Sequence, residues 1–125
     1  MEEWTKPVFD KNGMTQWYWR VVGVENFKLG EHVEIGSFTI IDAKEGVTIE
    51  NNVKIGWNCS IFSISTVDGK KGKIILKKNC KIGANSVIIP GITIGENATV
   101  GANSLVNQDV PANEIWAGTP ARKIK

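Results

Sequence analysis

Between Leu76 and Val106 an aliphatic side chain recurs at every sixth position. These anchors are Leu76, Ile82, Ile88, Ile94, Val100 and Val106. A second inward slot follows four positions after each of the first five anchors and holds Cys80, Ser86, Ile92, Ala98 and Ser104. A period of six fits neither one face of an α-helix nor a long alternating strand. It predicts short straight runs separated by turns, stacked as a repeat fold.

The same spacing extends toward the N-terminus with two interruptions. Earlier anchors are Leu29, Ile35, Ile41, Ile49, Ile55 and Ile61, with two extra residues between Ile41 and Ile49. The phase breaks again between Ile61 and Leu76, around the sequence SISTVDGKKGK. Three hexads close one triangular turn, so we expect coils at 29–48, 49–69, 70–87 and 88–105. The predicted fold is an all-β parallel β-helix of about four to five coils, with loops at two corners.

Residues 1–23 do not follow the six-residue rule and carry an unusual number of aromatic side chains. Trp4, Trp17, Tyr18 and Trp19 lie in this segment, together with turn signals at Pro7 and Asn12-Gly13. We interpret 1–23 as an N-terminal cap that shields the first coil, 24–110 as the β-helix and 111–125 as a C-terminal tail of one domain. An alternative use of Trp17 or Trp19 is stacking on a sugar or base.

Composition limits the partners and the compartment. The chain has 125 residues and a formal net charge of +2, which gives no reason to expect nucleic acid. Cys59 and Cys80 both fall in the second inward slot, so we expect packed thiols rather than a disulfide or metal pair. With His32 as its one histidine, the chain predicts no metal site. No signal peptide or apolar run of membrane length is evident, so we expect a cytoplasmic protein without membrane contact.

The segment from Lys81 to Lys125, with its Pro90-Gly91 turn and its AGTPAR ending, carries a family resemblance. It resembles the C-terminal half of sugar O- and N-acetyltransferases of the hexapeptide-repeat acyltransferase family, and the likeness extends over roughly 24–125. This resemblance implies a left-handed parallel β-helix that assembles as a homotrimer. It also implies acetyl-coenzyme A as the acetyl donor, bound in a groove between neighbouring subunits.

The resemblance also suggests which residues meet the cofactor. It implies pantetheine contacts at Ala84 and Ala102, and a border of the pantetheine and adenosine at Asn107 and Gln108. Relatives often have lysine where this chain has Gln108. Basic tail positions that meet the phosphates of the coenzyme correspond to Arg122 and Lys125, in keeping with the cations that a polyanion requires.

Three residues are candidates for catalysis. In many relatives a histidine on a loop of a middle coil takes the acceptor proton, and the resemblance puts Thr66 at that position. A threonine hydroxyl is far too weak a base to do this unaided. Asp42 opens a corner loop one coil before Thr66, where it would hold the acceptor. His32 lies about two coils earlier on another side of the prism, and only subunit packing would bring it to the cleft.

The missing histidine favours an amine acceptor. A hydroxyl must lose its proton as it attacks a thioester, whereas a neutral amine attacks first and loses its proton later. The predicted function is therefore acetyl transfer from acetyl-CoA to a sugar, with an amino sugar or nucleotide-linked amino sugar preferred. The alternatives are a sugar O-acetyltransferase with another base and a non-catalytic β-helix trimer. A metal hydratase on the same fold would need three histidines per site, which a single chain does not supply.

Overall fold

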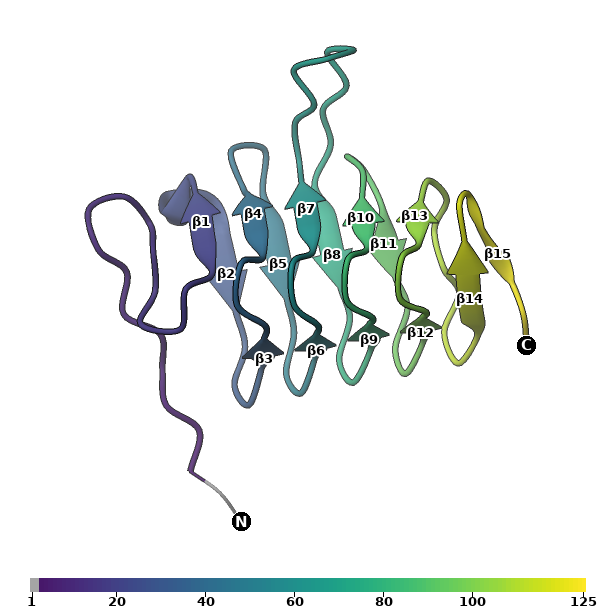
Figure 1. The fold of residues 1–125 in the computed structure, drawn as a ribbon, viewed down its shortest axis with the longest axis horizontal. Coiled ribbons are helices and arrows are strands. Elements are labelled where there is room, and N and C mark those ends of the chain that lie inside the picture. Colours follow the sequence, from purple (N-terminus) through teal and green to yellow (C-terminus); the bar gives the residue numbers. More distant parts are fainter. Residues whose placement is uncertain (1–2) are drawn as a thin grey trace.

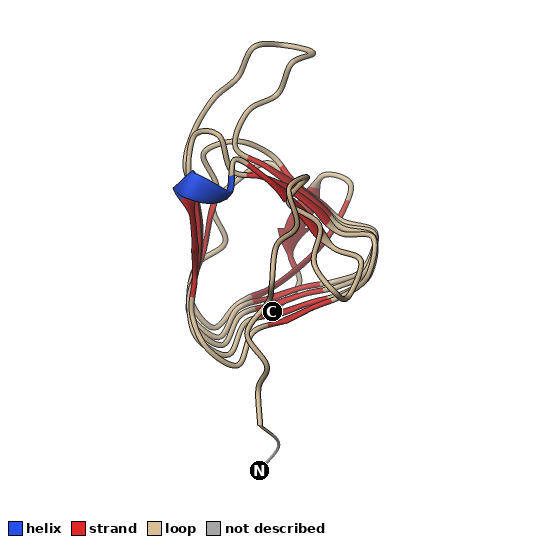
Figure 2. Cartoon of the chain, turned by 90° about the vertical axis from the view of Figure 1, so that its left-hand side faces the viewer, coloured by secondary structure: helices blue, strands red, loops and turns tan. Residues whose placement is uncertain are grey.

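The computed structural model describes residues 3–125, which form a parallel β-helix of triangular cross-section (Figure 2). Within these residues the one helical element is a single 3₁₀ turn, η1 (Val24–Asn26). Sheet A consists of β1 (Arg20–Val22), β4 (Ile40–Asp42), β7 (Ser60–Phe62), β10 (Val87–Ile88) and β13 (Leu105–Val106). Sheet B consists of β2 (Phe27–Leu29), β5 (Val47–Ile49), β8 (Ile74–Leu76) and β11 (Thr93–Ile94). Sheet C consists of β3 (Glu34–Ile35), β6 (Lys54–Ile55), β9 (Lys81–Ile82), β12 (Thr99–Val100), β14 (Ile115–Gly118) and β15 (Ala121–Lys123).

The chain makes about five turns and winds left-handed. In Figure 1 the strands of sheet A rise on the near side and the strands of sheet B descend behind them, while the axis advances from left to right. Neighbouring coils pair in parallel and in strict register, so that Ile41 lies opposite Val21 and Ile61. The predicted fold class is therefore confirmed. The predicted coils follow the same repeat, but they start at Leu29, the end of a strand of sheet B. In the structure the solenoid starts one strand earlier, with β1 of sheet A.

The narrow core contains the side chains that the six-residue rule selects. Every anchor between Leu76 and Val106 is at most 3% exposed, and the second slot is buried as well, including its serines at 86 and 104. Each buried aliphatic side chain contributes on the order of 1.5–3 kcal/mol to folding. Cys59 and Cys80 are free, buried thiols, and burial raises the pKa of Cys80 to about 12. The expectation of packed thiols is confirmed.

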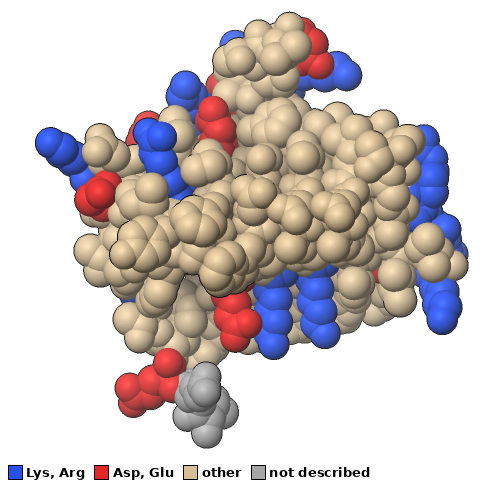
Figure 3. Space-filling view, in the orientation of Figure 1, with Lys and Arg blue, Asp and Glu red and all other residues tan. Residues whose placement is uncertain are grey.

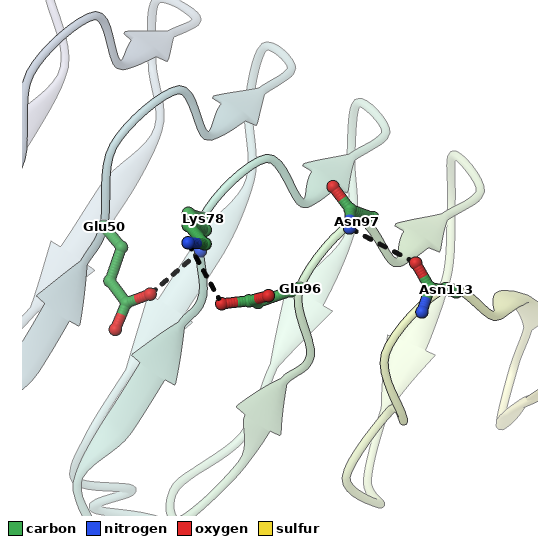
Figure 4. A network of polar contacts seen from close by, with 5 residues as sticks. All are labelled: Glu50, Lys78, Glu96, Asn97 and Asn113. Atoms are coloured by element: carbon green, nitrogen blue, oxygen red, sulfur yellow. Dashed lines mark hydrogen bonds and ion pairs between the residues drawn. The ribbon is translucent and has the colours of Figure 1, made fainter.

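The corners turn through residues in the left-handed region of φ. At the corner between sheets B and C this position holds His32, Asn52, Asn79, Asn97 and Asn113, all with φ between 56° and 66°. Asparagine tolerates this conformation better than most residues. Figure 4 shows part of this corner, where the Asn97 side chain donates to Asn113 Oδ1 over 3.2 Å. In the same view Glu50 accepts the backbone N–H of Lys78, and Glu96 forms an exposed ion pair with the Lys78 ammonium.

The first strand of the solenoid lies within the segment that the sequence assigned to the cap. β1 pairs with β4, and Trp19, which immediately precedes it, is 3% exposed. Trp19, Phe9 and Phe27 contact one another edge to face, with ring centroids 5.8–6.3 Å apart. This aromatic cluster closes the N-terminal end of the core.

The other end of the solenoid is closed by the C-terminal tail. β14 continues sheet C in parallel beside β12, and β15 then folds back antiparallel to β14. Trp116 and Ala121 cover the last coil, with 9% and 1% exposure. No helix among residues 3–125 is long and apolar enough to cross a membrane.

Candidate functional site

The outward face of sheet A is largely apolar. Side chains on either side of the buried anchors point away from the core, and on this sheet they include Ile40, Phe62, Val87 and Leu105. The corresponding outward positions of sheet C carry Glu34, Lys54 and Lys81. Figure 3 shows the near face of the molecule with a broad central area free of charged side chains. The outward face of sheet A is therefore better suited than that of sheet C to packing against another protein surface.

One edge of sheet A, toward sheet B, carries a long projecting loop at 63–73 (Figures 1 and 2). Asp42 ends β4 at this edge and lies opposite Phe62, the last residue before the loop. The backbone N–H of Ser63 donates to the Asp42 carbonyl over 2.8 Å. Thr66 stands three residues farther along, exposed, within the loop. Asp42 and Thr66 therefore occupy the same corner of adjacent coils, the arrangement that the sequence predicted.

The loop is a hairpin held by its own turn. The Ser65 N–H donates to the Lys70 carbonyl over 2.8 Å, and the Lys70 N–H donates to the Asp68 carboxylate over 3.1 Å. The hydrogen bond from the Lys70 N–H, and after it one from the Ser65 hydroxyl, lower the pKa of the Asp68 carboxyl below its ordinary value. Sequence analysis did not single out Asp68, although the pair Asp68-Gly69 is a common hairpin-turn signal. The loop thus carries a second carboxylate at its turn, Asp68.

The opposite edge of sheet A, toward sheet C, holds the predicted pantetheine contacts. Ala84 and Ala102 lie at equivalent corner positions of successive coils, where the Asn103 N–H donates to the Ala84 carbonyl over 2.9 Å. A Cβ on Gly83 would lie only 2.4 Å from the backbone nitrogen of Ala102, so the coils approach closely along this edge. Small side chains therefore line this edge of the solenoid.

The predicted contacts to the rest of the coenzyme lie at the C-terminal end. Asn107 and Gln108 are exposed directly after β13. Arg122 on β15 reaches back so that its guanidinium lies 3.5 Å from Asn107 Oδ1. Lys125 is exposed at the end of the chain. The structure brings Arg122 and Asn107 together, and both face solvent.

His32 is far from these residues in the coil sequence and lies at another corner. It occupies the turn between sheets B and C of the first coil, exposed, with its ring 6.1 Å from that of Trp4. Within one chain it does not join Asp42 or Thr66, which lie at the corner between sheets A and B. The described residues, 3–125, contain no cluster of three or more His, Cys, Asp or Glu side chains suited to a metal ion.

The arrangement supplies orientation rather than strong base catalysis. The Asp42 carboxylate is half-buried and accepts the Lys44 N–H over 3.1 Å, which fixes its direction. A carboxylate held in this way can accept a hydrogen bond from an amine or a hydroxyl. Thr66 adds a hydroxyl but no base.

Comparison with known proteins supports the same class. The model "Bacterial transferase hexapeptide (six repeats)" matches residues 73–108, and "Hexapeptide repeat of succinyl-transferase" matches residues 28–65. Galactoside O-acetyltransferase of Escherichia coli is 35% identical over 119 residues, covering 79% of this chain and 56% of that enzyme.

Two solved structures show the same fold. A hexapeptide-repeat-containing acetyltransferase of Vibrio cholerae, complexed with acetyl-coenzyme A, superposes with a TM-score of 0.81 at 30% identity and covers 86% of this chain and 63% of its own. AntD, an N-acyltransferase of Bacillus cereus, was solved as an S84A mutant with dTDP-4-amino-4,6-dideoxyglucose and coenzyme A. Its TM-score is 0.71 at 26% identity, over 92% of this chain and 81% of its own.

The fold and the matched repeats together define the class, a β-helix of hexapeptide repeats. The chain belongs to the hexapeptide-repeat transferase family. It spans less than two thirds of the length of both the Escherichia coli enzyme and the Vibrio cholerae protein.

Proposed function

We propose that this protein transfers an acetyl group from acetyl-CoA to a small amine-bearing sugar. The observation that carries the proposal is the apolar outward face of sheet A, with Asp42 and Thr66 at one edge and the small residues Ala84 and Ala102 at the other. Support for the donor comes from relatives solved with acetyl-coenzyme A or coenzyme A. Support for the acceptor comes from relatives described as a galactoside O-acetyltransferase and as an N-acyltransferase bound to a nucleotide-linked amino sugar. The need for acetyl-CoA fits a cytoplasmic location.

The active site would be shared between copies of the chain. Asp42 and Ala84 lie at opposite edges of sheet A, so a single chain does not bring acceptor and donor together. Burial of the apolar face against neighbouring copies would place the 63–73 loop of one chain beside Ala84 and Ala102 of the next. A homotrimer satisfies this geometry, because each of three prisms then contributes both edges. Sedimentation equilibrium should give about three chain masses, and a stable monomer at micromolar concentration would exclude the shared site.

Within that cleft each residue has a defined part. Asp42 would accept a hydrogen bond from the attacking group and hold it toward the thioester carbonyl. Ala84 and Ala102 would leave backbone groups free for the pantetheine, and Asn107 and Gln108 would border the coenzyme beyond it. Arg122 and Lys125 would meet its phosphates. The amine attacks in its neutral form, forms the amide bond and expels coenzyme A as a thiolate, and the excess amine proton passes to water or to Asp42.

Whether the acceptor group is an amine or a hydroxyl is tested by placing a histidine, the base found in many relatives, at position 66. The assay follows release of coenzyme A thiol with glucosamine and glucose as paired acceptors. Thr66→His should raise turnover of the hydroxyl acceptor by up to about 10²-fold, because general-base help is worth about 10²–10⁴-fold where a proton must leave during attack. It should change the amine reaction little, as should Thr66→Ala and His32→Ala.

Asp42→Asn tests whether the Asp42 carboxylate positions the acceptor. It keeps the shape and the Lys44 contact while removing the charge, and should raise KM for the amine or lower kcat. Loss of all turnover in His32→Ala, with acetyl-CoA still bound, would show that His32 reaches the cleft from a neighbouring chain. O-acetylation would then be the better assignment.

A second candidate function is a non-catalytic β-helix trimer, which the threonine at position 66 favours. It predicts that acetyl-CoA binds weakly or not at all and that no acceptor releases coenzyme A. The paired assay above separates the two.

A further inference from the structure

A cavity lies between the N-terminal segment and the first coil, and none of the candidate catalytic or cofactor residues except His32 lines it. Its volume is about 400 Å³, within the range of small-molecule pockets. Three indoles line it: Trp4 from the N-terminal segment, and Trp17 and Trp19 from the residues that lead into β1. Trp19 is buried in the cap, whereas Trp17 is 38% exposed. The cavity is therefore lined by three indole side chains, one of which, Trp17, is also open to solvent.

The polar lining of the cavity is negatively charged. Glu3 and Glu34 line it together with His32, and no lysine or arginine does. Within residues 3–125 neither glutamate forms an ion pair, although Lys54 lies beside Glu34 in the strand register. A pocket with two carboxylates and no cation disfavours phosphates, including those of coenzyme A.

The cavity exists because the first coil departs from the repeat. At the corner between sheets B and C the four later coils place asparagine in the left-handed turn, and the first coil places His32 there. The His32 ring packs against Trp4 with centroids 6.1 Å apart and planes tilted by 43°. The Trp4 indole N–H donates to the Val33 carbonyl over 2.9 Å, which fixes this wall of the cavity. The indole is thus held by contacts that no other coil makes.

We propose that this cavity binds a small organic cation, a molecule bearing an ammonium group. Tryptophan is the side chain whose ring attracts a cation most strongly. A cavity lined by three indoles and two carboxylates combines this attraction with that of negative charge. The site takes ammonium compounds and rejects their uncharged counterparts of equal shape. It does not depend on acetyl transfer, and its test contains no coenzyme.

The experiment compares choline with 3,3-dimethylbutan-1-ol, in which carbon replaces the charged nitrogen. Binding to the full chain is followed by tryptophan fluorescence and by the indole N–H signals in NMR. Choline should bind saturably and at least tenfold more tightly than the neutral alcohol. Glu34→Gln and Trp17→Leu should each weaken choline binding about three- to tenfold while the melting temperature stays close to that of the parent. Glu31→Gln is the matched control, because Glu31 is an exposed carboxylate of the same turn outside the cavity, and it should change nothing.

Three results would overturn the proposal. Equal affinity for choline and the neutral alcohol would show a merely apolar pocket. Tighter binding of glucose than of choline would show a neutral carbohydrate site. Equal effects of Glu34→Gln and Glu31→Gln, or no saturable binding of choline, would show that the cavity selects no cation.

Discussion

The first two coils and the last two coils make the same turn with very different residues. At the corner between sheets C and A, the left-handed position holds Asn85 and Asn103 in the later coils but Tyr18 and Phe38 in the first two, with φ of 67° and 68°. Asparagine adopts this conformation at little cost, whereas a bulky side chain there is strained. Tyr18 and Phe38 are nevertheless 65% and 60% exposed, so burial does not compensate them.

The difference separates two roles along one solenoid. The later coils follow the repeat closely, with alanine and asparagine at their corners. The early coils depart from it, with exposed aromatic residues, a cavity and longer loops. Backbone strain, such as a bulky residue in the left-handed region of φ, clusters at active sites and ligand-binding surfaces. In the function proposed above, the later half would hold the donor and the earlier half would recognise the acceptor.

The largest effect should come from filling the close contact in the later coils. In Gly83→Ala the new Cβ would meet the backbone of Ala102 at 2.4 Å, so the coils must separate. We expect a loss of about 3 kcal/mol in the free energy of unfolding, the upper range for overpacking. Gly101→Ala is the control, since its Cβ would meet chiefly the Ala117 side chain at 2.9 Å, and it should cost about 1 kcal/mol. Equal losses in urea unfolding would show that backbone approach is not what the glycine preserves.

Alkaline pH should destabilise the core through Cys80. Burial, reinforced by the nearby Glu50, raises the pKa of this thiol from 9.0 to about 12. The folded protein therefore holds the thiol proton more tightly than the unfolded chain does. That stabilisation is complete below pH 9 and is lost as the pH rises toward 12, at up to about 1.4 kcal/mol per pH unit. Urea midpoints of the parent and of Cys80→Ala should converge between pH 9 and pH 11, and parallel profiles would contradict the assignment.

The smallest effect tests the strain at the early corner. Phe38→Asn replaces phenylalanine with asparagine, the residue that the later coils have in this left-handed turn. The change should relieve about 1–2 kcal/mol of backbone strain. It also removes the edge-to-face contact with Trp57, whose ring centroid is 6.1 Å away, worth about 0.5–1.5 kcal/mol. The difference predicts a change in the free energy of unfolding between a loss of about 0.5 kcal/mol and a gain of about 1.5 kcal/mol, measured by thermal unfolding. A loss greater than 1 kcal/mol would show that Phe38 is held by packing and is not strained.

Much of the fold follows from the sequence because the repeat is a local rule. The anchors and their second slots fix which side chains enter the core, and the two phase breaks locate the loops after β4 and β7. The placement of Asp42 and Thr66 on one corner follows from the same count. In each case the spacing of a few residues determines the geometry.

Other features depend on contacts between segments that lie far apart in the chain. The six-residue rule does not predict that β1 starts at Arg20. The residue before it, Trp19, packs in the core against Phe9 and Phe27, and these contacts follow no period in the sequence. The contact of Trp4 with the first coil depends on a chain segment without any period. The apolar outward face of sheet A could have been found from the residues that flank the anchors, such as Phe62 and Leu105, but the anchors alone do not indicate it.

The central claim is that the regular half holds acetyl-CoA, and calorimetric titration tests it most directly. The parent should bind about one acetyl-CoA per chain. Arg122→Ala with Lys125→Ala should weaken this binding by about 1–3 kcal/mol, the range of charge-assisted contacts, with a smaller loss for dephospho-coenzyme A if a phosphate is what they meet. No heat of binding in the parent, or equal losses for the two coenzymes in the double variant, would contradict this assignment of the cofactor site.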